Sequence, residues 1–301
     1  NTSLSLHSGV GEKTVTSDFT PAIPRNSYSS NSFQVHSYFI ILDDLQDGGM
    51  VRRGKPCWHV LPDVKQQAAN DASMLRSFLC KILKENFHGT PSWHSLTNLL
   101  YEFQAFLFTS IGQHMDSMTT KLTSNNYHNF TMDRYKNIVK YKTSYLLKLP
   151  IYLAMTLSGN QDLQSFQYVD NICNDIGILM QMKNDYVDCF DDGCGHYGTD
   201  IQEGKCTWLA VSALQRCTAP QRIVFAACYG SHEPAHIERT QQLYIKMDLP
   251  KLYMEEEQAM SDQIVRKANV LSGNASALSR IFNITISNPS AVCGDYDDAF
   301  H

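Results

Sequence analysis

The stretch that decides the fold runs from Val35 to Gly49 and reads Val-His-Ser-Tyr-Phe-Ile-Ile-Leu-Asp-Asp-Leu-Gln-Asp-Gly-Gly. Its apolar side chains recur at the i, i+3, i+4, i+7 spacing of one buried helical face, namely Val35, Tyr38, Phe39, Leu42 and Leu45. The glycine pair that follows is typical of a helix end. The pattern therefore predicts a helix whose last turn carries an acidic motif, Asp43 to Asp47.

The rest of the chain repeats this pattern of long amphipathic stretches divided by short polar breaks. We expect further helices over residues 68–85, 93–120, 132–158, 162–188, 206–215, 219–230, 236–247 and 250–272. Strand signals are nearly absent. The pattern predicts an all-α fold, a helical bundle that builds its site from side chains facing inward on opposing helices.

Length and composition favour one large domain. Of the 301 residues, we expect 32–301 to form it and 1–31, rich in Ser, Thr, Asn and Gly, to be a poorly ordered arm. With 43% hydrophobic residues, 18% charged residues and a net charge of −5, the chain has no basic excess that would draw it to nucleic acid. Its apolar stretches are too short to span a bilayer.

The nine cysteines form no CxxC pair and no Cys/His cluster at zinc spacing, so we expect reduced thiols rather than a disulfide or zinc framework. A reducing, cytoplasmic setting fits this usage. Because the first residue is Asn1 rather than Met, a targeting peptide ahead of it stays open.

The first acidic motif has the chemistry of a metal and phosphate site. Asp43 and Asp47 are four positions apart, so they lie on one side of a helix and can share cations. Their hard oxygens suit Mg²⁺, which completes its shell with waters and substrate phosphates. Arg52 and Arg53 follow, and guanidinium groups bind phosphate oxygens bidentately. A merely solvated helix end is the alternative, but acids there oppose the helix dipole, so the combination favours a diphosphate site.

A second acidic motif ends the expected helix 162–188, where Asn184-Asp185-Tyr186-Val187-Asp188 follows another apolar face. Downstream, Thr199 to Lys205 forms a polar cluster able to hydrogen-bond a phosphate or water. Taken alone, that cluster fits an ordinary charged surface loop. Because the cluster follows a second acidic motif like the first, the combination indicates that both belong to one site.

From about Ser32 to about Ile286 the chain resembles farnesyl diphosphate synthases. The resemblance rests on Asp43 to Asp47 with Arg52-Arg53-Gly54 and Cys57-Trp58, Ala72 to Leu75, Gly112-Gln113 with Met115-Asp116, Lys142-Thr143, Asp185 to Phe190, and Gly198 to Lys205 with Cys206 and Trp208. It implies the isoprenoid synthase helical bundle around a deep central cavity, usually homodimeric. It also implies three Mg²⁺ ions that bridge an allylic diphosphate to the two acidic motifs.

The resemblance implies a role for each matching position. Asp43 and Asp47 would be metal ligands, and Arg52, Arg53, Lys142 and Lys205 would hold the allylic diphosphate. Thr143 and Gln181 would flank the reacting carbons. Tyr38 and Phe39 would cap the hydrocarbon cavity, which Phe108, Gln113 and Asp116 would also line, although helical spacing alone makes both caps ordinary core residues.

The chain departs from this family pattern at several positions. Asn184 replaces the first aspartate of the second motif, and His196 stands where the family has a lysine. No Gly-Gly-Lys-x-x-Arg co-substrate motif precedes the first acidic motif, and the tail is acidic rather than basic. Asn184, Asp188 and Asp192 have the spacing of the metal-binding motif of class I terpene synthases.

We therefore interpret the chain as a Mg²⁺-dependent terpene synthase, with Asn184 and Asp188 joining Asp43 and Asp47 as metal ligands. It resembles the insect enzymes that are modified farnesyl diphosphate synthases, and would cyclise or rearrange farnesyl diphosphate to a sesquiterpene. One alternative is a farnesyl diphosphate synthase that condenses isopentenyl diphosphate with an allylic diphosphate. The other is a non-catalytic partner subunit.

Overall fold

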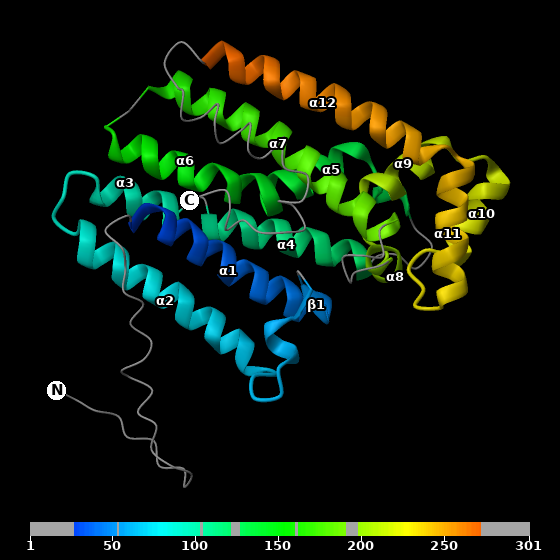
Figure 1. The fold of residues 1–301 in the computed structure, drawn as a ribbon, viewed down its shortest axis with the longest axis horizontal. Coiled ribbons are helices and arrows are strands. Elements are labelled where there is room, and N and C mark those ends of the chain that lie inside the picture. The colour runs from blue at the N-terminus through cyan, green and yellow to red at the C-terminus, as the bar shows by residue number, and fades with distance from the viewer. Residues whose placement is uncertain are drawn as a thin grey trace, which may run out of the picture.

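The computed structural model describes residues 27–52, 54–102, 105–121, 127–159, 162–190 and 198–271. Long helices lie side by side in this part of the chain (Figure 1). Helix α1 (Ser27–Asp47) packs against α2 (Gln67–Phe87) and α6 (Tyr145–Leu157), and α7 (Leu163–Phe190) packs against α6 and α12 (Leu249–Leu271). The prediction of an all-α bundle is confirmed.

Shorter helices complete the bundle. They are α3 (Trp93–Thr97), α4 (Ala105–Lys121), α5 (Met132–Val139), α8 (Thr199–Glu203), α9 (Trp208–Arg216), α10 (Ala219–Cys228) and α11 (Pro234–Lys246), with the 3₁₀ turns η1 (Trp58–Val60) and η3 (Tyr127–Asn129). Two further segments, η2 (Asn98–Glu102) and η4 (Lys140–Ser144), are π-helical. A hairpin of β1 (Val51–Arg52) and β2 (Lys55–Pro56) turns at Gly54, where φ is +71°.

Several boundaries differ from the predictions. Helix α1 begins at Ser27 instead of near residue 32. The helix expected over 93–120 is divided among α3, η2 and α4, and the one over 132–158 among α5, η4 and α6. Helical periodicity continues through a π turn, so the sequence pattern does not reveal either break. The polar cluster Thr199 to Lys205, for which no helix was predicted, contains α8.

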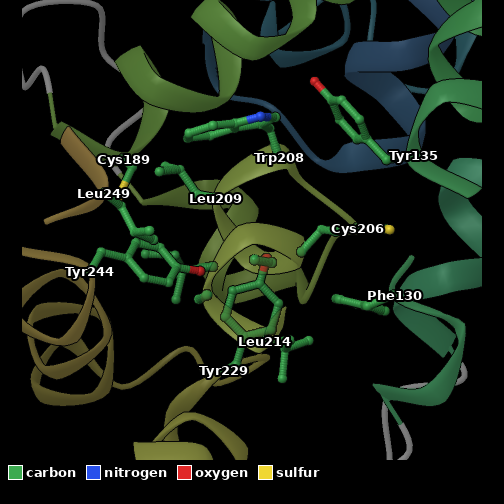
Figure 2. Packing of buried hydrophobic residues seen from close by; sticks show 14 of the residues in the cluster. Phe130, Tyr135, Cys189, Cys206, Trp208, Leu209, Leu214, Tyr229, Tyr244 and Leu249 are labelled. Atoms are coloured by element: carbon green, nitrogen blue, oxygen red, sulfur yellow. The ribbon is translucent and has the colours of Figure 1, made fainter. Parts of the chain in front are cut away.

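Three buried clusters hold the bundle together. The first joins α5, the end of α7 and α9 to α12, and includes Tyr135, Trp208, Tyr229 and Tyr244 (Figure 2). The second joins α1, α2, α4 and α6, and the third joins α6, α7 and α12. Together they fix the ends of α1 and α7, where the acidic motifs lie.

Two expectations about the environment of the chain can be compared with the described residues. Within those ranges, no helix is long and apolar enough to cross a membrane. The seven cysteines in the described part, Cys57, Cys80, Cys173, Cys189, Cys206, Cys217 and Cys228, are all free thiols, as predicted.

Candidate active site

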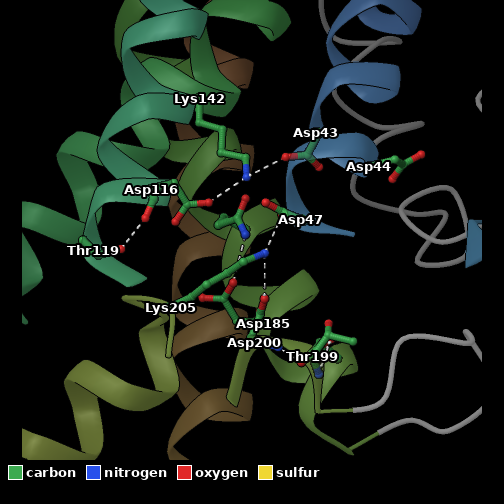
Figure 3. A network of polar contacts seen from close by, with 12 residues as sticks. Asp43, Asp44, Asp47, Asp116, Thr119, Lys142, Asp185, Thr199, Asp200 and Lys205 are labelled. Carbon is green, nitrogen blue, oxygen red and sulfur yellow. Dashed lines mark hydrogen bonds and ion pairs between the residues drawn. The ribbon is translucent and has the colours of Figure 1, made fainter. Parts of the chain in front are cut away.

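The first acidic motif lies in the last turn of α1, and its outer carboxylates contact lysines from distant parts of the chain. Lys142 Nζ lies 3.0 Å from Asp43 Oδ1, and Lys205 Nζ lies 2.7 Å from Asp47 Oδ2 (Figure 3). Burial would raise the pKa of Asp43, but Lys142, with Lys205 and Arg52, outweighs it and holds this pKa well below the usual range. Both acids are therefore paired with ammonium groups, and a Mg²⁺ ion could take the place of the lysine on each carboxylate while a phosphate takes the place of the carboxylate on each lysine.

The two lysines stay charged although they are buried. Burial favours the neutral amine, but Asp116 and Asp43 raise the pKa of Lys142 above its ordinary value. Asp200 and Asp47 do the same for the pKa of Lys205, which lies 3.3 Å from Asp200 Oδ1. Lys142 also lies 2.7 Å from Asp116 Oδ2. The site thus holds two permanent ammonium groups between carboxylates.

Arg52 enters from the β1–β2 hairpin. Its guanidinium lies 2.6 Å from Asp44 Oδ1 and 3.2 Å from Asp43 Oδ2. Asp44 is only 4% exposed, so this middle aspartate of the motif faces the protein and holds Arg52 rather than facing the site. Arg53 lies outside the described residues.

The second acidic motif ends α7, and the structure turns Asp185 rather than Asn184 into the cluster. Asn184 is exposed, whereas Asp185 is 2% and Asp188 is 9% exposed. Asp185 Oδ2 accepts from the Trp208 backbone amide at 2.7 Å, and its Oδ1 accepts from Gln181 Nε2 at 2.9 Å. The metal ligands expected at this motif were Asn184 and Asp188, whereas the two buried carboxylates are Asp185 and Asp188.

Asp188 links the end of α7 to the start of α8. Its carboxylate accepts from the backbone amides of Thr199 at 3.2 Å and Asp200 at 3.0 Å, and also from the Thr199 hydroxyl. These bonds fix the start of α8, where Asp200 pairs with Lys205, and Lys205 in turn contacts Asp47 of the first motif. Asp192 and His196 lie outside the described residues.

Burial and mutual repulsion raise the pKa values of the acids in the second motif, whereas the pKa of Asp43 is lowered. Burial, then Asp200, raises the pKa of Asp185 to about 8 and that of Asp188 to about 7. Hydrogen bonds from Trp208 and Thr199 work against this rise without cancelling it. Added cations would lower both values, because an ion favours the charged form.

The donor set fits Mg²⁺. Asp43 Oδ1 is buried and, among the described residues, accepts no hydrogen bond, since its contact with Lys142 is an ion pair only. Across the cluster, seven carboxylates face three cationic side chains: Asp43, Asp44, Asp47, Asp116, Asp185, Asp188 and Asp200 with Arg52, Lys142 and Lys205. In the described part, no group of three or more His, Cys, Asp or Glu forms a ready-made cage. An excess of hard oxygens without a closed cage suits an ion that keeps waters and takes substrate phosphates as ligands.

Lys142 and Thr143 are presented by the π turn η4, which two glycines admit. A Cβ on Gly112 of α4 would lie 2.2 Å from the Lys142 backbone nitrogen, and one on Gly177 of α7 would lie 2.2 Å from Ser144 Oγ. Real Cβ atoms do not approach a backbone nitrogen that closely, so position 112 requires glycine, whereas a Cβ at Gly177 would require the Ser144 side chain to move. The Thr143 hydroxyl then donates to Gln181 Oε1 at 3.2 Å.

A small polar cavity lies beneath the lysines. It measures about 40 Å³ and is lined by Asp116, Tyr135, Ile138, Val139, Lys142, Gln181, Asp185, Asp200, Lys205, Cys206 and Thr207. Sites for drug-sized ligands measure roughly 300 to 1,000 Å³, so a prenyl diphosphate requires the lysine–aspartate pairs to separate. Gln113 Nε2, on α4, is buried and has no hydrogen-bond partner among the described residues.

Aromatic side chains of α1, α4 and α6 form two groups in the bundle. Tyr38 and Phe39 of α1 pack edge to face at 4.8 Å, and Tyr38 also meets Phe106 at 5.3 Å. Phe108 lies 4.6 Å from Tyr145 in a second group. None of these rings lines the cavity described above, so the cavity-lining role expected for Tyr38, Phe39 and Phe108 stays a prediction.

Sequence reasoning missed three site residues, Asp44, Asp185 and Asp200. All belong to motifs that the sequence analysis quotes, but no role was given to them. For Asp185 a signal exists: the buried spacing Ile172, Ile176, Leu179, Met182 continues to Asp185 and Cys189, which places Asn184 off that face. Aspartate in phase with a buried face predicts an anchored carboxylate.

The bundle and its acidic cluster have the isoprenoid synthase fold. T. brucei farnesyl diphosphate synthase complexed with the bisphosphonate BPH-722 superimposes with a TM-score of 0.76 at 27% sequence identity, covering 88% of this chain and 77% of that one. A second T. brucei structure, complexed with risedronate, gives a TM-score of 0.74 at 26% identity and covers 90% and 78%.

Residues 32–247 match the Polyprenyl synthetase family, and the chain belongs to that family. It is 36% identical over 241 residues to the farnesyl pyrophosphate synthase of Murgantia histrionica, covering 79% of this chain and 58% of that protein. It is also 36% identical over 226 residues to the mitochondrial farnesyl pyrophosphate synthase 1 of Arabidopsis thaliana, covering 74% and 58%. The chain thus spans about 58% of the length of these relatives. The predicted resemblance and fold class are confirmed at this level.

Proposed function

We propose that this chain is a Mg²⁺-dependent enzyme that ionises an allylic prenyl diphosphate. The observation that carries the proposal is the pairing of Asp43 and Asp47 with Lys142 and Lys205. Every partner in these pairs has a use in binding a diphosphate, since the carboxylates suit Mg²⁺ and the ammonium groups suit phosphate oxygens. Family membership supports the same substrate class.

The proposed step breaks the bond between the allylic carbon and the diphosphate oxygen, and the electron pair leaves with the diphosphate. Arg52, Lys142 and Lys205 would bind the departing group and balance its growing charge. Mg²⁺, held by Asp43 and Asp47 and assisted by the second motif, would supply further charge neutralisation on the same oxygens. The carbon fragment is left as an allylic cation.

Chain elongation is the fate that we place first. In it, the double bond of isopentenyl diphosphate attacks the cation, a new carbon–carbon bond forms, and a proton is lost to give a longer allylic diphosphate. The named relatives support this fate, because those from stink bugs and plants alike are farnesyl pyrophosphate synthases.

Cyclisation is the second candidate, and Asn184 is the specific observation that favours it. An uncharged ligand at that position is typical of class I terpene synthases, in which the cation is attacked by its own distal double bonds. The upstream motif and the tail do not separate the two fates, since the chain spans about 58% of the relatives' length. The terpene synthase interpretation therefore rests on Asn184 within the described residues.

We also propose a homodimer. Three large apolar side chains are exposed on neighbouring parts of the bundle, with Met74 and Phe78 on α2 at 45% and 43% and Leu107 on α4 at 47%. Apolar side chains spaced one turn apart on a helix surface are typical of contact faces. Size-exclusion chromatography with light scattering would give twice the chain mass if this is correct, and the chain mass if it is not.

One pair of incubations tests the function. The protein with Mg²⁺ receives farnesyl diphosphate alone in one tube, and geranyl diphosphate with isopentenyl diphosphate in the other, followed by analysis of volatiles and chain length. Farnesyl diphosphate from the second tube alone supports elongation, and a cyclic sesquiterpene from the first supports cyclisation. Turnover in neither tube would overturn the proposal and favour a non-catalytic subunit.

A further inference from the structure

A chain of hydrogen bonds runs through the site from the π turn to α9. The Thr143 hydroxyl donates to Gln181 Oε1 at 3.2 Å, and Gln181 Nε2 donates to Asp185 Oδ1 at 2.9 Å. Asp185 Oδ2 accepts from the Trp208 backbone amide at 2.7 Å. Four side-chain and main-chain groups from three different elements are therefore linked, and the donations from both ends lead to the Asp185 carboxylate.

The direction of this chain is fixed at its Trp208 end. A backbone N–H can only donate, and it cannot rotate without moving the start of α9, whose Trp208 side chain is 1% exposed. Asp185 is 2% exposed and has both oxygens engaged as acceptors. When bound cations lower the pKa of Asp185 and keep its carboxylate charged, it can only accept hydrogen bonds, and the amide of Gln181 then presents its NH₂ to Asp185 and its carbonyl oxygen to Thr143.

Gln181 lies beside the proposed diphosphate site, so the orientation of its amide matters for the charge that forms there. Gln181 lines the same cavity as Lys142, and Thr143 is the residue next to Lys142. If Lys142 holds the diphosphate, as proposed above, the allylic carbon bonded to it would lie near this contact. The charge that develops there on ionisation is positive, and a carbonyl oxygen stabilises it while an NH₂ group opposes it.

We propose that Asp185 is a positioning residue that sets the amide of Gln181 with its oxygen toward the allylic cation. This inference rests on the proposed function and assigns to Asp185 a role other than that of a metal ligand. Asn184, its neighbour, is exposed and free of this constraint, so the two residues divide the tasks of the second motif.

A charge-conserving exchange of the two side chains tests the proposal. In Asp185→Asn, the Asn Oδ1 keeps the Trp208 amide, but its NH₂ faces Gln181, so the glutamine turns and points its own NH₂ toward Thr143. We expect the maximal turnover to fall about 100-fold with little change in KM or Mg²⁺ requirement. In the double variant D185N/Q181E, residue 181 accepts from the NH₂ of the new amide at position 185 and again presents an oxygen to Thr143, and turnover should recover to within about tenfold of wild type.

A binding measurement provides a readout that does not depend on turnover. A prenyl chain ending in a protonated tertiary amine mimics the cation, and calorimetry can follow its binding with Mg²⁺ and inorganic diphosphate. Asp185→Asn should weaken amine binding about tenfold and leave the binding of Mg²⁺ and diphosphate unchanged, and the exchange variant should restore it. Asp175→Asn, a matched substitution on α7 whose partner is Lys267 of α12, should leave both activity and amine binding unchanged.

The outcomes separate this inference from the proposed function. A wild-type chain that neither turns over a prenyl diphosphate nor binds the amine overturns the function, and this inference with it. With an active wild type, a raised Mg²⁺ requirement in Asp185→Asn would identify a metal ligand and overturn the inference alone. If D185N/Q181E turned over no faster than Asp185→Asn, this inference alone would also be overturned.

Discussion

At the end of α1, Asp43 and Asp47 contact the side-chain cations Lys142, Lys205 and Arg52, whereas at the end of α7, Asp185 and Asp188 accept hydrogen bonds from backbone amides. A lysine side chain can leave a carboxylate for a phosphate by rotating a few bonds. A backbone amide cannot leave without movement of its helix.

The difference teaches that two motifs of similar spacing can divide one task. The first motif has partners that substrate and ion can exchange, which suits binding. The second has partners that fix α8 and α9, which suits alignment of Lys205 and Gln181. Electrostatics agrees with this division, because cations lower the pKa of Asp43 while burial raises the pKa of Asp185 and Asp188.

The largest effect is expected from Asp43→Ala. This change removes a proposed metal ligand and one partner of Lys142, so diphosphate release from an allylic substrate should fall by about 10³-fold. A phosphate-release assay over a range of Mg²⁺ concentrations measures it. Asp63→Ala, at an exposed position between η1 and α2, is the control and should retain full activity. If Asp43→Ala retained the wild-type rate, the first motif would not be part of the active site.

Gly112→Ala should break the same site from the lysine side. The new Cβ would lie 2.2 Å from the Lys142 backbone nitrogen, so η4 must shift and carry Lys142 and Thr143 away from Asp43 and Gln181. We expect a free energy of unfolding lower by about 3 kcal/mol and a turnover lower by about 100-fold. Chemical denaturation and the same release assay measure both.

Ser110→Ala, at an exposed position on α4, is the matched control for Gly112→Ala and should change neither quantity. If Gly112→Ala behaved like this control, the close approach of α4 to η4 would play no part in placing Lys142.

Asn184→Asp sharpens the comparison at the second motif. Because Asn184 is exposed, the free energy of unfolding should change by less than about 0.5 kcal/mol. An added carboxylate near the ion site should lower the Mg²⁺ concentration for half-maximal activity by about tenfold. Gln164→Glu adds the same charge at the opposite end of α7 and should not alter the Mg²⁺ response. An unchanged Mg²⁺ response in Asn184→Asp would place residue 184 away from the ions.

Much of this arrangement could be predicted from the sequence. Period-3.6 patterning located α1 and α7 and their acidic ends, because burial of one face dominates helix formation. The identities of Asp43, Asp47, Lys142 and Lys205 predicted a charged site, and the structure brings all four together. Local pattern and chemical type were sufficient for these residues.

The remainder depends on contacts between distant segments. The π turn at η4 arises where Gly112 and Gly177 let two helices approach its backbone, and nothing in residues 140–144 alone signals it. Tyr186, within the second acidic motif, stacks on Tyr253 of α12 at 4.1 Å, a contact that no local pattern signals. Which partner a polar or aromatic side chain meets is decided by packing, and packing is not local.

The smallest effect concerns the pH dependence of the ion-free protein. The folded state raises the pKa of Asp185 to about 8 and of Asp188 to about 7, from an ordinary value of 3.8. Between about pH 4 and pH 8 the folded state therefore binds more protons than the unfolded chain, and the free energy of unfolding falls as pH rises. Thermal melts in a chelator should show the Tm declining by several degrees from pH 6 to about pH 8.

Mg²⁺ with inorganic diphosphate should reverse that decline, because the ions favour the charged carboxylates. The ligands should therefore raise the Tm more at about pH 8 than at pH 6. Asp188→Asn, which cannot titrate, should reduce the slope in the chelator. A Tm that rises with pH in the ion-free protein would mean that the second motif is charged without ions, and the contrast between the two motifs would then fail.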